Sequence, residues 1–107
     1  MTPQILEERL IDFAVNIVNA VESLPNLPNC KAGNHIANQL IRSGSSPAPN
    51  YGEAQSAESR RDFVHKMKIS LKELRETMIW LKIIARKRFG HCNDIPAAIN
   101  ECDELII

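Results

Sequence analysis

The sequence predicts an all-α protein, an antiparallel up-down bundle of four helices that forms a single domain over residues 1–107. Three observations support this fold class. Apolar residues recur every three or four positions through most of the chain, which is the period of an α-helix. No stretch alternates apolar and polar residues as a half-buried strand does. The connections between the periodic segments are short, which favours antiparallel neighbours.

The first helix is expected over residues 3–24. Thr2 precedes Pro3, as an N-cap residue precedes a proline in the first turn of a helix. Pro25 ends the helix, because the residue before a proline avoids the helical conformation. The apolar side of this helix comprises Leu6, Leu10, Phe13, Ala14, Ile17, Val21 and Leu24.

The second helix is expected over residues 30–55, with a kink, or with a break and a restart, near its middle. Residues 43–49 read Ser-Gly-Ser-Ser-Pro-Ala-Pro. Each proline inside a helix removes a hydrogen bond, at a cost of ~3 kcal/mol. Ser46, directly before the first proline, is placed to cap a restarted helix. Alternatively, Asn50 and Glu53 have the spacing of a capping box.

The third helix, over residues 59–89, is the longest, and at 1.5 Å per residue it extends about 45 Å. Ser59 and Asp62 have capping-box spacing, and Gly90 is a natural C-terminal stop. The fourth helix is expected over residues 94–107. The apolar stripe of the third helix comprises Phe63, Met67, Ser70, Leu74, Met78, Leu81 and Ala85, widened by Val64, Leu71 and Ile83.

Charge is distributed unevenly along the chain, although thirteen Lys and Arg balance thirteen Asp and Glu. Residues 59–90 carry ten bases and three acids, giving a net charge of +7. Residues 1–30 have a net charge of −3, and residues 91–107 have a net charge of −4. The long third helix is therefore basic, and the two terminal helices are acidic.

Two interpretations of the basic helix stay open. In the first, which the sequence favours, it pairs with acidic elements of the monomer or of neighbouring subunits. In the second, its Lys and Arg bind phosphates of RNA or DNA and release counterions. Few aromatic residues lie among the bases, so such binding would be directed at the backbone and sensitive to salt. The phosphate contacts would come from Arg60, Arg61, Lys66, Lys68, Lys72 and Arg75.

Composition excludes several classes of protein. Hydrophobic residues make up 44% of the chain and charged residues 24%, values that do not fit a disordered protein. No apolar run approaches the ~20 residues of a membrane span, and the N-terminus lacks the features of a signal peptide. Cys30, Cys92 and Cys102 are odd in number and widely spaced. We therefore expect reduced thiols that act as small apolar residues, and a cytoplasmic protein.

No catalytic motif is recognisable. The sequence lacks a phosphate-binding loop, a nucleophile elbow and an HExxH motif. A carboxylate-bridged metal site in a bundle needs two Glu-x-x-His pairs, and the chain offers only Asp62-x-x-His65. A metal enzyme built around these two residues, Asn50 and Glu53 is a minor alternative. We predict no catalytic residue, no metal and no cofactor.

Polar residues are concentrated around the proline-containing interruption, and Arg42, Asn50 and Glu53 stand out among them. The favoured interpretation is structural. These side chains satisfy backbone groups that the prolines free, or they form ion pairs with neighbouring helices. The functional alternative is a polar site at the kink that is open to a ligand or partner.

Several short motifs follow one another in a fixed order along nearly the whole chain. They are Leu10-Ile11-Asp12-Phe13-Ala14, Leu24-Pro25, Gln39-Leu40-Ile41-Arg42-Ser43 with Ser46, Asn50 and Glu53, Ser59-Arg60-Arg61-Asp62-Phe63, and Ile69-Ser70-Leu71-Lys72-Glu73-Leu74 with Glu76. In this order and spacing they resemble the four-helix-bundle proteins encoded in 23S rRNA intervening sequences. The chain departs from that family at the interruption, where Pro47, Pro49 and Gly52 replace a smooth helical run.

The resemblance implies an all-α bundle without catalytic activity that assembles as a ring-like homopentamer. It also implies similarity to the accessory variability protein of diversity-generating retroelements, which is basic, binds nucleic acid and contacts a reverse transcriptase. The expected function is therefore a non-enzymatic oligomeric scaffold, with RNA or DNA as a further partner through the third helix. The alternative is a module for protein partners alone, in which acidic helices mask the basic helix.

Overall fold

The computed structural model describes residues 1–24, 31–87 and 94–106, and the described residues form five helices. These are α1 (Pro3–Ser23), α2 (Lys31–Ser45), α3 (Pro47–Gln55), α4 (Arg60–Lys87) and α5 (Asp94–Ile106). Pro25, Cys30, Phe89, Gly90 and Cys92, on which some predictions fall, lie outside the described residues.

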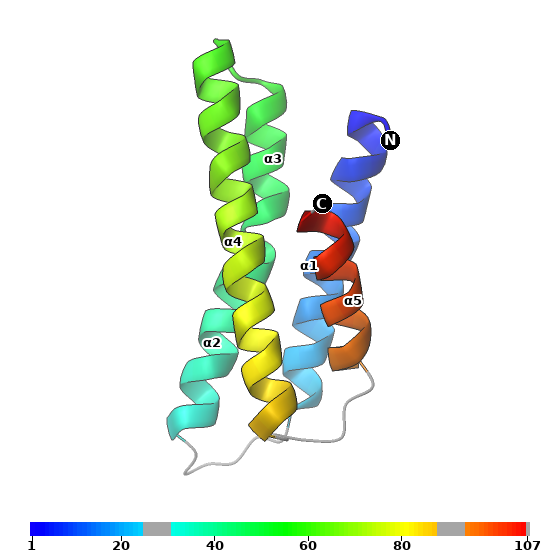
Figure 1. Cartoon of the computed structure of the whole chain (residues 1–107), viewed down its shortest axis with the longest axis vertical. Coiled ribbons are helices and arrows are strands. Elements are labelled where there is room, and N and C mark those ends of the chain that lie inside the picture. The colour runs from blue at the N-terminus through cyan, green and yellow to red at the C-terminus, as the bar shows by residue number, and fades with distance from the viewer. Residues whose placement is uncertain (25–30, 88–93, 107) are drawn as a thin grey trace.

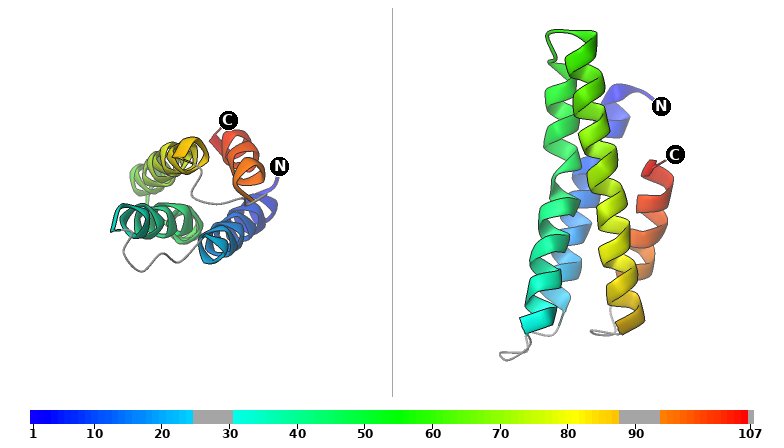
Figure 2. Two further views of the ribbon diagram at one scale, coloured as in Figure 1. Left: turned by 90° about the horizontal axis from the view of Figure 1, so that it is seen from below. Right: turned by 60° about the vertical axis from the view of Figure 1, so that its left-hand side comes forward.

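The helices pack side by side as an elongated bundle of 47 × 24 × 18 Å (Figure 1). α2 and α3 follow each other in one line and together fill one corner, while α1, α4 and α5 fill the other three (Figure 2). α1 and α4 each pack against α2, α3 and α5, and in the described part of the chain their own backbones do not approach each other. α1 and α4 run in one direction and the other helices in the opposite one (Figure 1). The predicted all-α bundle is confirmed.

Two predicted N-caps are present. The Thr2 hydroxyl accepts a hydrogen bond from the backbone N–H of Ile5 at 3.2 Å, at the start of α1. The Ser59 hydroxyl accepts one from the backbone N–H of Asp62 at 3.1 Å, at the start of α4. Such caps satisfy N–H groups that the first turn of a helix leaves without partners.

The buried hydrophobic cluster draws most of its side chains from α1, α4 and α5, while α2 and α3 contribute one residue each. Phe13 and Ile17 of α1 and Leu81 of α4 are among its fully buried members. Two residues of the predicted third-helix stripe, Phe63 and Ala85, are exposed instead, and so are Val64 and Ile83, which were expected to widen it. For Phe63 the reason is that α5 ends before it reaches the first turns of α4 (Figure 1).

The interruption in the second helix is a break with a restart, so residues 30–55 do not form one kinked helix. α2 ends at Ser45 and α3 begins at Pro47, with Ser46 between them in a helical conformation (φ −77°, ψ −38°). The Ser46 side chain makes no capping hydrogen bond, so that expectation was wrong. Both prolines lie in the first turn of α3, where the missing N–H groups have no partner within the helix.

Gly44 allows α2 to pack closely on α1. A Cβ atom built at this position would lie 2.8 Å from Cγ2 of Ile17. That separation is shorter than any normal contact between carbon atoms, so a side chain here would push the two helices apart. The glycine in the interruption is thus explained by helix packing rather than by a turn.

α5 is much shorter than α4, with 13 residues against 28. α5 therefore covers only part of the length of the bundle, and the first turns of α4, α3 and the start of α1 extend beyond it (Figure 1). The fourth corner of the bundle is therefore filled at one end and open at the other.

Candidate functional site

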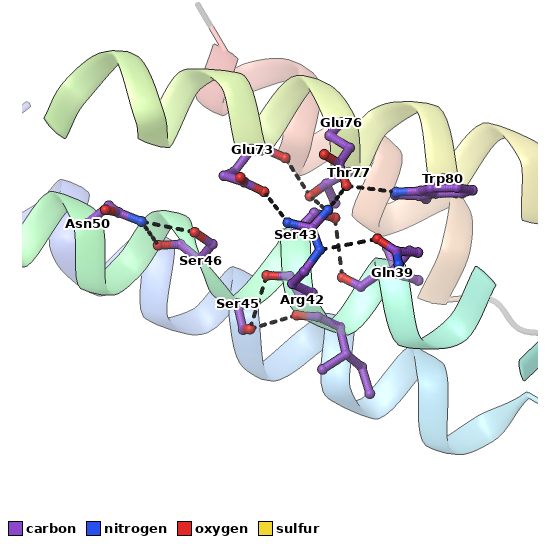
Figure 3. Close-up of polar contacts among 12 residues, drawn as sticks. Gln39, Arg42, Ser43, Ser45, Ser46, Asn50, Glu73, Glu76, Thr77 and Trp80 are labelled. Atoms are coloured by element: carbon purple, nitrogen blue, oxygen red, sulfur yellow. Dashed lines mark hydrogen bonds and ion pairs between the residues drawn. The ribbon is translucent and has the colours of Figure 1, made fainter. Parts of the chain in front are cut away.

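Arg42 makes three side-chain contacts, two of which connect α2 with α4 (Figure 3). Its Nη1 donates to a carboxylate oxygen of Glu73 at 3.1 Å, and its Nη2 forms an ion pair with Glu76. Its Nε donates to the Gln39 amide oxygen at 3.1 Å. The guanidinium therefore holds two helices together and is fully engaged within the protein.

A polar link lies buried behind Arg42. The hydroxyl oxygens of Ser43 and Thr77 are 2.9 Å apart, and the Thr77 hydroxyl is 2.7 Å from the Glu73 carbonyl oxygen. Glu76 also accepts a hydrogen bond from the indole N–H of Trp80 at 3.0 Å. These bonds satisfy polar atoms inside the bundle, where an unpaired group costs ~1–3 kcal/mol.

Trp80 is thus a structural residue. Besides its hydrogen bond to Glu76, it meets the ring of His35 edge to face, with 6.1 Å between ring centroids. It is one of the few aromatic residues among the bases of the long helix. Its half-buried position beside α2 leaves it unavailable as a stacking platform on the outer face of α4.

Asn50 and Glu53 do not form the alternative capping box, and they do not share a site with Arg42. The Asn50 amide N–H donates to the Ser46 carbonyl at 3.0 Å and to the Ser46 hydroxyl at 2.9 Å (Figure 3). Glu53 instead accepts a hydrogen bond from the Lys66 ammonium of α4 at 3.2 Å. Each of the three predicted polar residues therefore has its own partners within the bundle.

Asp62 and His65 belong to the first turns of α4. The backbone of Asp62 completes the cap at Ser59, and His65 is exposed in a shallow hollow among basic side chains. In the ranges that the structure describes, no three His, Cys, Asp or Glu side chains are placed to share a metal ion. Asp62, His65, Asn50 and Glu53 are therefore not brought together as a metal-binding group.

The outer face of α4 carries a row of side chains that we call the α4 stripe. Its apolar members alternate along the helix with bases, and Ile79 is 56% exposed. None of the bases forms an ion pair with another described side chain. The stripe comprises Lys72, Arg75, Ile79, Lys82, Ile83 and Arg86, all exposed.

A second group of exposed bases lies at the start of the same helix, and we call it the N-terminal basic cluster. It comprises Arg60, Arg61, His65 and Lys68, which line one shallow hollow together with Val64. The six predicted phosphate contacts are thus divided. Three lie in this cluster, Lys72 and Arg75 lie in the α4 stripe, and Lys66 points to α3, where it pairs with Glu53.

The outer face of α1 carries an exposed row of opposite charge, which the sequence analysis did not single out. Ile11, Val15 and Val18 are 41%, 52% and 36% exposed, and their spacing of four and three residues places them on one face. Glu8 and Glu22 lie at the two ends of this row and are also exposed. We call these five residues the α1 stripe.

The two stripes match in length and chemistry. Glu8 and Glu22 are separated by 14 residues, as are Lys72 and Arg86, and this is about 21 Å along a helix. Val15 lies midway between the two acids, and Ile79 lies midway between the two bases. α1 and α4 occupy different corners of the bundle and run in the same direction (Figures 1 and 2). One copy therefore exposes both stripes, and the two run parallel from N-terminal to C-terminal end.

An apolar groove of about 450 Å³ lies at the open end of the bundle. It is bounded by the start of α1, by α3, by the first half of α4 and by the last turn of α5. Its largely apolar lining comprises Met1, Leu6, Leu10, Tyr51, Phe63, Val64, Met67, Leu71, Leu74, Leu105 and Ile106, with Lys68 at the edge.

Cys102 lies in the core, as predicted for a small apolar residue. Its thiol donates to the Leu74 carbonyl at 3.2 Å. Burial raises the pKa of the Cys102 thiol to about 12, and the nearby carboxylates of Asp103 and Glu101 act in the same direction. The side chain is therefore a protonated core residue and a poor nucleophile.

No helix in the described ranges is long and apolar enough to cross a membrane.

Comparison with known proteins assigns the family. No curated protein matches the sequence. The crystal structure of a protein of unknown function from Bacteroides thetaiotaomicron, a member of the S23 ribosomal protein family, is similar, with a TM-score of 0.84. The two chains are 30% identical, over 99% of this chain and 92% of that one. Residues 5–106 match the model of the 23S rRNA-intervening sequence protein family, and the chain belongs to this family.

Proposed function

We propose that the protein is a non-enzymatic, cytoplasmic scaffold that assembles from several copies of the chain. In this assembly the α1 stripe of one copy packs against the α4 stripe of the next. The observation that carries the proposal is the match between the two stripes, in charge, in apolar content and in the 14-residue spacing of their charged ends.

Within the described residues of one copy, the charged side chains of both stripes form no ion pair. The described ion pairs use Arg9, Arg42 and Lys66, and none uses a stripe residue. Docking of α1 on α4 pairs Glu8 and Glu22 with bases, because the spacing of the charges is equal. It also covers exposed apolar side chains of both helices, which supplies the hydrophobic gain that surface ion pairs alone lack.

Such a contact joins two different surfaces, so it is heterologous. A heterologous contact forms a closed ring when the rotation between copies closes, and an open chain otherwise. The resemblance to the intervening-sequence proteins implies a ring of five copies. This arrangement uses the acidic α1 to mask much of the basic α4, as the favoured interpretation of the sequence requires.

Charge reversal tests the assembly. Light scattering or native mass spectrometry of the purified chain should give one defined oligomer at micromolar concentration. Glu8→Lys with Glu22→Lys, or Lys72→Glu with Arg86→Glu, should each weaken association at least ~100-fold, because like charges then face each other across the contact. The fourfold variant, which exchanges the charges between the stripes, should assemble again.

Matched controls are Lys31→Glu on α2 and Glu58→Lys before α4, because both residues are exposed outside the stripes. Both variants should assemble as the original chain does. A monomeric original chain, or a fourfold variant that stays dissociated, would refute this assembly. A mass that grows without limit with concentration would indicate an open chain instead of a ring.

A second candidate function is binding of RNA or DNA along α4. The observation that favours it is the row of unpaired bases on the outer face of this helix, from Arg61 to Arg86, which is about 38 Å long. Affinity should then fall steeply between ~50 and ~200 mM salt. The charge-reversed variants distinguish the two functions. The fourfold variant should regain assembly but not nucleic-acid binding, since its α4 stripe has lost two bases.

A further inference from the structure

The N-terminal basic cluster lies largely outside the contact between the α1 and α4 stripes. In a parallel contact, Glu8 of one copy faces Lys72 of the next. α1 begins at Pro3, five residues before Glu8, so its first residue lies level with position 67 of α4. The part of the cluster from Arg60 to His65 lies beyond that level, by up to seven residues or about 10 Å of helix. The bases of the α4 stripe are covered in the assembly, whereas this part of the cluster stays free.

Every copy in such an assembly has the same orientation. α1 and α4 run in one direction within a copy (Figure 1), so a parallel contact between α1 and the next α4 does not invert the next copy. A ring that closes around an axis along the bundle requires this relation between its copies. The clusters of all copies therefore lie along one edge of the assembly, separated by the width of a bundle that measures 24 × 18 Å across.

The cluster is a concentrated positive surface without internal compensation. Its arginines, lysine and histidine line one hollow together with Val64, and the described lining of this hollow contains no acid. All of these side chains are exposed. None of the basic ones forms an ion pair with a described side chain. An anionic ligand would therefore meet several unpaired cations at once.

The residue types in the hollow favour phosphate groups over an acidic peptide. Arg60 and Arg61 are adjacent, and a guanidinium binds phosphate oxygens through paired N–H donors. Val64 is the apolar member of the described lining, so a helical peptide finds little apolar surface to bury there. A row of equal clusters along one edge also suits a ligand whose charge repeats evenly along its length.

We propose that the edge formed by these clusters binds the phosphate backbone of nucleic acid, with several copies of the chain in contact with one molecule. This inference rests on the assembly proposed above. It differs from binding along the α4 stripe, because in the assembly α1 occupies that stripe. Each cluster that binds raises the effective concentration of the phosphates for the next cluster, so the assembly should bind much more tightly than a single copy.

A fluorescent DNA duplex of 20 base pairs, about 68 Å long, is the probe. Arg60→Gln with Arg61→Gln should weaken its binding at least tenfold and leave the oligomer mass unchanged. Lys31→Gln with Lys87→Gln is the matched control, because it removes two exposed bases outside the cluster and the α4 stripe. It should bind the duplex as the original chain does. Equal losses in the two variants would show that net charge alone governs binding, and would overturn the proposal.

Glu8→Lys with Glu22→Lys tests whether assembly brings the clusters together. This variant is more positive than the original chain but loses the contact between copies, so duplex binding should weaken at least tenfold. The slope of log affinity against log salt concentration, about −0.9 for each phosphate neutralised, should fall at least twofold in magnitude. The fourfold variant assembles again and should regain duplex binding. Tighter binding by Glu8→Lys with Glu22→Lys would assign the nucleic acid to the uncovered α4 stripe, and would overturn the proposal.

Native mass spectrometry of the same samples separates the possible failures. A monomeric original chain refutes the assembly and, with it, this inference. A defined oligomer that binds the duplex equally well with and without Arg60→Gln and Arg61→Gln refutes this inference alone. Poly-glutamate with the same number of charges as the duplex is the last probe. If it binds as tightly as the duplex and displaces it, the edge serves an acidic protein and the proposal fails.

Discussion

The two ends of the bundle differ in how completely the fourth corner is filled. Toward the end of α4, Leu81 and Ile84 are 0% and 3% exposed, in the same core as the buried residues of α5. Toward its start, Phe63 and Val64 belong to the same apolar pattern but remain more than a third exposed. The pattern of α4 therefore continues past the helix that covers it. Apolar periodicity marks a face that is suited to be covered, whether or not the same chain supplies the cover.

The largest expected difference between the two ends is in stability. Leu81→Ala should lower the free energy of unfolding by ~2–5 kcal/mol, because it leaves a cavity in a fully buried site. Val64→Ala at the open end should lower it by less than ~1 kcal/mol, because the removed methyl groups were already partly in water. Urea unfolding monitored by circular dichroism measures both values. Equal losses for the two variants would mean that the open end is covered in solution.

The filled end also depends on a close approach of α1 and α2. Gly44→Ala should destabilise the protein by ~1–3 kcal/mol, because the new Cβ atom would lie 2.8 Å from the Ile17 side chain. Ile17→Ala removes both Cγ atoms that the new Cβ would approach, so the losses from the two changes should be less than additive if the clash is the cause. Additive losses in the double variant would exclude that explanation.

The sequence was sufficient for the all-α bundle and its N-caps at Thr2 and Ser59, because these depend on local periodicity and on capping. It located the interruption of the second helix but left open whether this was a kink or a break, and it offered the Ser46 side chain or an Asn50–Glu53 capping box as the cap. The partner of the Ser46 hydroxyl depends on the orientation of the Asn50 side chain, which donates a hydrogen bond to it. The sequence pattern does not contain this orientation. The role of Gly44 likewise depends on a residue 27 positions away, Ile17.

The candidate surfaces were only partly predictable. The bases of α4 were evident from charge counting, but only packing shows that Lys66 pairs with Glu53 while Lys72 faces outward. The α1 stripe had a signal in the sequence, namely a second apolar row at helical spacing that includes Val15, beside the core-facing row. The groove had none within any single helix, because it arises from the unequal lengths of α4 and α5.

The pH dependence of the free energy of unfolding reports how well α5 buries the Cys102 thiol in the core. The pKa of the Cys102 thiol is about 12 in the folded protein, above its ordinary value of 9.0. Above pH 9 the unfolded chain loses this proton first, so unfolding becomes more favourable as pH rises toward 12. Between pH 8 and pH 10 this term should lower the stability by about 1 kcal/mol. The Cys102→Ala variant should lack this term, so its stability should decline less over that interval. Parallel curves would show that the thiol is accessible to solvent.

The smallest expected effect lies at the boundary between the two ends, where Arg9 pairs with Glu101 and Glu104. Partly exposed ion pairs contribute little to global stability, so Arg9→Ala should lower the free energy of unfolding only slightly. Its local effect should be larger, because these contacts hold the last turns of α5 against α1. Amide hydrogen exchange near Leu105 should accelerate, while exchange near Ile95 stays unchanged. Lys31→Ala is the matched control, since Lys31 is exposed on α2 and forms no ion pair with a described residue. Uniform acceleration along α5 would show that the helix opens as one unit. In that case the Arg9 ion pairs would not hold its last turns separately.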